Sequence, residues 1–134
     1  MTLFTWNDTY STGTEQLDEQ HKTLISIANR YTRSYKCGHG REILETIFNE
    51  LINQALVHFA DEEDLLRQHG HPDFYRDRTS HDHLATLMVD YQKQFERSTR
   101  GIESKAMLLI HNLLNAHMPG AGRNQHLAGH DPQP

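Results

Sequence analysis

Residues 41–68 read REILETIFNELINQALVHFADEEDLLRQ, a stretch that contains neither proline nor glycine. Apolar residues recur along it at three- and four-residue steps, the spacing of one face of a helix. On that face His58 and Glu62 stand one turn apart where apolar residues would be expected. The complete face consists of Leu44, Ile47, Leu51, Ala55, His58, Glu62 and Leu65. The stretch therefore predicts a long amphipathic helix whose inward face carries ionisable groups.

Three further segments show the same spacing. The first begins near Asp18 and is ended by Gly38 and Gly40, the next follows Pro72, and the last follows Gly101. Four helices with short connections predict an all-α, antiparallel up-down-up-down four-helix bundle. The inward faces expected for these three helices are Leu17, His21, Leu24, Ala28, Tyr31 and Tyr35; Phe74, Asp77, His81, Leu84, Met88, Tyr91 and Phe95; and Ala106, Ile110, Leu113, Leu114 and His117.

The two ends of the chain lack helical periodicity. Residues 1–17 mix Trp, Thr, Asn and Ser, and are predicted to form an extended N-terminal arm. Near the other end, residues 119–122 read PGAG, which cannot continue a helix. We therefore expect the bundle to occupy residues 1–118 and a disordered tail to occupy residues 119–134.

Composition excludes several classes of function. The chain has 134 residues, enough for one domain, and a net charge of −5, which disfavours binding to nucleic acid or to an anionic membrane surface. No apolar run approaches the roughly 20 residues of a membrane span. The N-terminus lacks the order of a signal peptide, and Cys37 is the single cysteine, which excludes an intrachain disulfide. We expect a cytoplasmic protein.

Each predicted helix places a metal-capable side chain on its apolar face. Burying that many ionisable groups would cost several kcal/mol unless something compensates them. A bound metal compensates all of them at once, because it neutralises carboxylates and accepts imidazole lone pairs. The predicted ligands are His21, His58, Glu62, Asp77, His81 and His117. The remaining histidines are expected in loops, in the tail or off the inward faces: His39, His69, His71, His83, His111, His126 and His130.

Several separate motifs, in this order, resemble the bacterial hemerythrin family over residues 6–118. They are Trp6 followed by YSTG at 10–13, LDEQHK at 17–22, HFADEE at 58–63, and GHPD at 70–73. The resemblance implies a bundle that holds two non-haem irons, with an oxo or hydroxo bridge, and that interacts with O2. It also implies that His21 and His58 bind one metal, that Glu62 bridges, and that His81 and His117 bind the other. The same donors would also suit manganese or zinc.

Two positions depart from the pattern that this resemblance implies. Asp77 stands where the family has histidine, and Gly122 stands where it has a bridging aspartate, just beyond Pro119. The metal near Asp77 is therefore expected to be the weaker and more hydrated one. This favours reaction with O2 or a related small oxidant in sensing, scavenging or redox roles over efficient transport.

Two alternatives remain open from the sequence. One is a di-iron enzyme of the oxidase or peroxidase type, in which the metal performs the chemistry. No acid–base residue other than the ligands is expected on the inward faces, which favours a binding protein over this enzyme. The other is a mixed-metal protein without O2 chemistry, because the sequence does not select iron over manganese or zinc.

Overall fold

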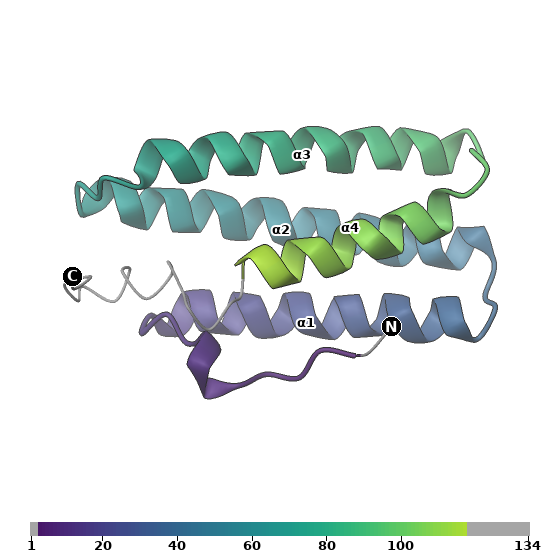
Figure 1. The fold of residues 1–134 in the computed structure, drawn as a ribbon, viewed down its shortest axis with the longest axis horizontal. Helices are drawn as coiled ribbons and strands as arrows, with labels where there is room; N and C mark the ends of the chain where they lie inside the picture. The colour runs from purple at the N-terminus through teal and green to yellow at the C-terminus, as the bar shows by residue number, and fades with distance from the viewer. Residues whose placement is uncertain (1–2, 118–134) are drawn as a thin grey trace.

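The computed structural model describes residues 3–117, and within that range it contains four α-helices, one short 3-10 helix and no strand. The elements are η1 (Asp8–Tyr10), α1 (Glu15–Lys36), α2 (Arg41–Gln68), α3 (Phe74–Glu96) and α4 (Ile102–His117). Successive helices run antiparallel and pack side by side (Figure 1). The predicted up-down-up-down bundle is confirmed. None of the described helices combines the length and apolar character needed to cross a bilayer.

The first three helices end in the same hydrogen-bonded turn, which sets the direction of each connection. After α1, Gly38 has a φ of 75°, and its N–H bonds to the carbonyl of Tyr35 at 3.1 Å. The same turn after α3 has Ser98 at the equivalent place, with a φ of 56° and a 3.0 Å bond to Phe95. A side chain at positive φ is strained, so serine there costs stability that glycine avoids.

One half of the bundle is filled by apolar side chains. Phe48 on α2 lies at its centre, with ring centroids 5.3 Å from Phe95 and 6.4 Å from Tyr31. The Tyr31 hydroxyl donates a 2.8 Å hydrogen bond to the carbonyl of Glu103, which ties α1 to the start of α4. Since Phe48 is fully buried, this half obtains its stability chiefly from removing apolar surface from water.

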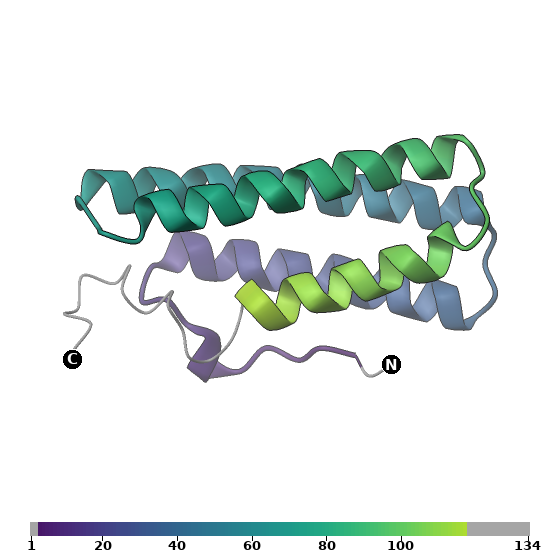
Figure 2. The same cartoon turned by 45° about the horizontal axis from the view of Figure 1, so that its top comes forward.

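The N-terminal arm lies along α1 and α4 (Figure 2). Its backbone at Phe4 is held by both the oxygen and the nitrogen of the Asn29 amide, at 2.8 Å and 2.7 Å. Closer to α1, Thr12 donates through its N–H and its hydroxyl to the Asp18 carboxylate, at 2.7 Å and 2.9 Å. The predicted arm therefore packs as part of the domain, and α1 begins at Glu15 rather than near Asp18.

Two predictions about individual residues are wrong. Tyr35 was expected on the inward face of α1 but is 37% exposed, since it lies in the last turn of the helix. His111 was expected off the inward face of α4 but is buried, with Nε2 3.2 Å from the Thr32 hydroxyl and its ring against Phe4. The arm covers the side of α4 that the helical pattern left outside. The predicted tail, residues 119–134, lies outside the described residues.

Candidate metal centre

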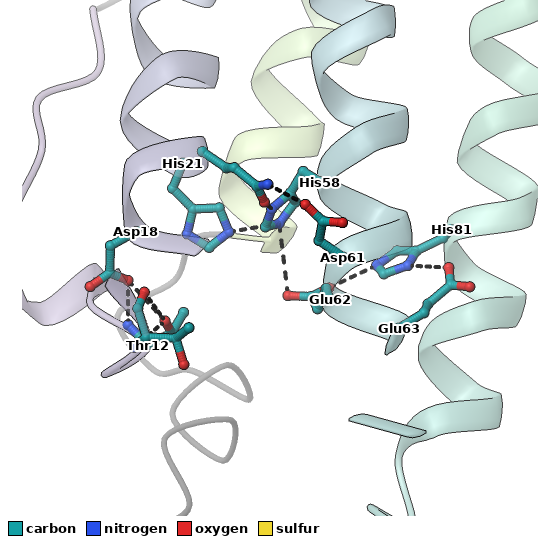
Figure 3. A network of polar contacts seen from close by, with 10 residues as sticks. Thr12, Asp18, His21, His58, Asp61, Glu62, Glu63 and His81 are labelled. Carbon is teal, nitrogen blue, oxygen red and sulfur yellow. Dashed lines mark hydrogen bonds and ion pairs between the residues drawn. The ribbon is translucent and has the colours of Figure 1, made fainter. Parts of the chain in front are cut away.

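Three metal-capable side chains converge in the other half of the bundle. His21 comes from α1, His58 and Glu62 come from α2, and one donor atom of each lies within 4.8 Å of the others. All three side chains are at most 2% exposed. The Nε2 atoms of the two histidines are 2.8 Å apart and face each other across the α1–α2 contact (Figure 3). Two imidazoles and one carboxylate form a donor set suited to a divalent transition metal.

Glu62 extends this cluster toward α3, because its two oxygens face different histidines. Oε2 is 3.8 Å from Nε2 of His58, and Oε1 is 3.0 Å from Nε2 of His81 (Figure 3). The carboxylate thus lies between a histidine of α2 and a histidine of α3. A carboxylate in this position has the arrangement required to bridge two cations.

The outer nitrogen of each of these two histidines has its own partner. His58 Nδ1 lies 2.8 Å from Oε1 of Gln20, and His81 Nδ1 lies 2.8 Å from Oε2 of Glu63. A hydrogen bond at one ring nitrogen fixes which nitrogen carries the proton, so both Nε2 atoms are left to face Glu62. Phe59 stacks on the His81 ring with centroids 4.1 Å apart and planes at 5°, which restricts its rotation.

Charge and burial shift the histidine pKa values in opposite directions. Burial lowers the pKa of His21 below its usual value, although the Glu62 and Asp18 carboxylates oppose the shift. For His81 burial also lowers the pKa, but hydrogen bonds and charge from Glu62 and Glu63 outweigh it and raise the pKa. The His21 side therefore favours a neutral imidazole with available lone pairs, whereas the His81 side carries excess negative charge.

The residues present fit a bound cation. The 2.8 Å contact between Nε2 of His21 and Nε2 of His58 needs a proton or another cation between two lone pairs. When the proton between the two rings is bonded to Nε2 of His21, Nδ1 of His21 is a buried acceptor. This atom has no hydrogen-bond partner among the described residues. Such groups cost stability when buried, and sites of this kind are commonly functional.

The remaining predicted ligands are placed as follows. Asp77 is 4% exposed on α3, one turn before His81, and its Oδ1 is 3.8 Å from Nε of Arg76. Among the described residues, the three-donor group comprises His21, His58 and Glu62 and does not include Asp77. His117 is the last residue of α4, and its side chain lies outside the described part of the chain.

Two residues that hold the histidines in place, Gln20 and Glu63, were not predicted from the sequence. Gln20 directly precedes His21 in the sequence and Glu63 directly follows Glu62, so each side chain lies about 100° around its helix from that ligand and is half-buried. Their contacts are made across to a neighbouring helix. One available signal was a polar residue one position from a predicted ligand, which is too common on helix surfaces to be selective. The other was the place of both residues inside the motifs LDEQHK and HFADEE, which does not identify their partners.

Comparison with known proteins agrees with the observed fold. Residues 12–120 match the model of the hemerythrin HHE cation binding domain. The bacteriohemerythrin of Methylococcus capsulatus is 28% identical over 120 residues, which cover 89% of this chain and 91% of that relative. The bacteriohemerythrin of Pseudomonas aeruginosa is 26% identical over 109 residues, which cover 81% of this chain and 71% of that relative. A crystal structure of wild-type hemerythrin superposes with a TM-score of 0.84 over 96% of this chain and 97% of its own, at 24% identity.

Proposed function

This chain belongs to the family of the hemerythrin HHE cation binding domain, and from that premise we propose that its buried cluster holds two non-haem iron ions. The family is one of non-haem di-iron proteins that bind O2. His21 and His58 would hold one ion, His81, Asp77 and His117 the other, and Glu62 would bridge them. The observation that carries this proposal is the position of Glu62, with one oxygen toward His58 and the other toward His81.

Metal content of purified variants tests this assignment. The wild-type protein is expected to bind two irons per chain. Glu62→Ala removes the bridge and should lower the content at both positions, whereas His81→Ala should leave the other ion in place. His83→Ala is the matched control, since His83 lies on the same helix two residues away and is exposed. A wild-type protein without bound metal, or equal losses in the His81 and His83 variants, would contradict the assignment.

The proposed reaction partner is O2 or a related small oxidant, in sensing, scavenging or redox chemistry rather than efficient transport. Iron supplies the electrons for such chemistry, and the surrounding side chains set its charge and its access to water. Asp77 supports this choice, because it is a buried carboxyl group placed one turn before His81. Negative charge there favours the oxidised metal, and reversible carriage of O2 requires the reduced state to survive. The cytoplasmic location stays a prediction.

Uptake and release of O2 by the reduced, iron-loaded protein separates these roles. The wild-type protein is expected to consume O2 and to return little of it under vacuum. Asp77→His replaces the carboxylate with a neutral nitrogen donor and should increase the recovered fraction. Asp82→His, at an exposed position of the same helix, controls for the added histidine. Full recovery of O2 from the wild-type protein would favour a carrier instead.

A further inference from the structure

The amide of Gln20 has only one orientation that satisfies its neighbours. Its Nε2 lies 2.6 Å from Oδ2 of Asp61, and its Oε1 lies 2.8 Å from Nδ1 of His58. An aspartate carboxylate accepts hydrogen bonds and does not donate them, so the atom facing Asp61 must be the NH2 group. The atom facing His58 is then the carbonyl oxygen, which can only accept.

This orientation determines the protonation of His58. Because Gln20 Oε1 accepts, Nδ1 of His58 must carry the proton. In the neutral ring Nε2 then carries the lone pair, and this atom lies 2.8 Å from Nε2 of His21 and 3.8 Å from Glu62. The chain of contacts from Asp61 through Gln20 therefore aims the donor nitrogen of His58 into the cluster.

The corresponding contact at His81 has a different chemical character. Its Nδ1 faces a carboxylate oxygen of Glu63 at 2.8 Å, so His81 has the same protonated nitrogen but a charged partner behind it. A carboxylate behind an imidazole raises its donor strength more than an amide does. The two histidines that face Glu62, His58 and His81, therefore differ in donor strength.

We propose that Gln20 is a positioning residue that fixes His58 with its Nε2 lone pair toward the metal, and that the amide at Gln20 and the carboxylate at Glu63 make the two metal positions unequal. This inference rests on the proposed metal centre but adds residues that do not themselves bind metal. The position near His21 and His58 receives the weaker imidazole donor, and the position near His81 receives the stronger one. Gln20 adds no charge to a region that already contains several carboxylates.

The first test determines the protonated nitrogen of His58 in the metal-free protein by ¹⁵N NMR of the imidazoles. Wild-type His58 is expected to carry its proton on Nδ1 only, and Gln20→Leu should give a mixture of the two tautomers. Gln16→Leu is the matched control, since Gln16 Nε2 also donates to Asp61 Oδ2, at 3.1 Å, and is not a partner of His58 Nδ1. An unchanged His58 spectrum in Gln20→Leu would overturn the inference, and this readout does not depend on metal.

The second test measures affinity for Zn²⁺, which is redox-inert. Gln20→Leu should weaken binding about 10- to 100-fold, the usual effect of removing the partner of a metal-ligating histidine. Gln16→Leu should leave it unchanged. The double variant Gln20→Glu with Asp61→Asn preserves the hydrogen-bond chain but places a carboxylate behind His58, so affinity should return to the wild-type value or exceed it. Equal losses in the Gln20 and Gln16 variants, or a double variant as weak as Gln20→Leu, would refute the positioning role.

Failure of the inference can be distinguished from failure of the proposed function. If wild-type protein binds Zn²⁺ and Gln20→Leu binds it equally well, the metal centre stands and the role of Gln20 is refuted. If wild-type protein binds neither Zn²⁺ nor iron, the proposed function fails, and the unequal metal positions fail with it. The NMR measurement then still decides whether Gln20 sets the tautomer of His58.

Discussion

The two halves of this bundle are built from the same helices but held together by different forces. Around Phe48 the four helices share apolar side chains, and their contacts are non-directional. Around Glu62, helices α1, α2 and α3 present imidazoles and carboxylates, each of which needs a partner at a definite distance and angle. The apolar half can therefore tolerate repacking, whereas the polar half depends on individual atoms. Stability and metal binding should accordingly respond to different substitutions.

The largest expected effect is on the apolar half. Phe48→Ala should lower the free energy of unfolding by about 3–5 kcal/mol, because it leaves a cavity where a fully buried ring contacted Tyr31 and Phe95. Urea denaturation of the metal-free protein measures the change. Val57→Ala is the control, since Val57 is 53% exposed on the same helix and should change stability by no more than about 0.5 kcal/mol. A similar small change in the free energy of unfolding for Phe48→Ala and Val57→Ala would mean that the apolar half contributes little to stability.

Metal should stabilise the protein only through the polar half. At a free Zn²⁺ concentration about 100 times the dissociation constant, binding should add about 2.7 kcal/mol to the free energy of unfolding. Chelation should remove this increment from the wild-type protein and lower its Tm. The Glu62→Ala variant should show a smaller loss, since its cluster lacks the carboxylate between His58 and His81. A wild-type Tm that is insensitive to chelation would separate the cluster from metal binding.

A smaller effect is expected at the turn after α3, which neither half of the bundle dominates. Ser98→Gly should raise the free energy of unfolding by about 1 kcal/mol, because glycine adopts a positive φ without the strain that a side chain meets. Gly38→Ala at the equivalent turn after α1 should lower it by a similar amount, although a Cβ there would have open space around it. Thermal unfolding of both variants measures the pair. Changes of equal sign would contradict an origin in backbone strain.

The smallest expected effect is a change in the pH dependence of stability. Burial, with a contribution from the charge of Lys36, lowers the pKa of His111 from its usual value of 6.5. The unfolded chain therefore binds a proton at this residue before the folded protein does, and stability falls as the pH drops below about 6.5. His111→Gln should reduce this fall, whereas His83→Gln should leave it unchanged. Denaturation midpoints at several pH values measure the difference, and parallel curves for the wild-type and His111 proteins would refute it.

The helical pattern was sufficient for much of the architecture. The bounds predicted for α2, residues 41–68, are those of the structure, because an uninterrupted apolar stripe ends at His69 and Gly70. The start of α1 was predicted three residues late, since Glu15 and Gln16 are polar and contribute nothing to the apolar stripe. Tyr35 fitted the stripe by spacing but lies in the last turn, where less of the neighbouring helix covers it.

Sequence alone determined the four helices and most of their inward-facing residues, among them His21, His58, Glu62 and His81 of the polar half, since these follow from a period that each helix carries in itself. Tertiary structure decided which side chains meet across the helices: Gln20 with His58, Glu63 with His81, and Thr32 with His111. Such pairs depend on the rotation and tilt of one helix against another, and a shift of one residue turns a helix by about 100°. The N-terminal arm buries His111 by packing Phe4 against it, although the two residues are far apart in the sequence, and no local pattern encodes the path of the arm. Hydrogen-bond partners across helices are therefore a property of the packed bundle and of no single helix.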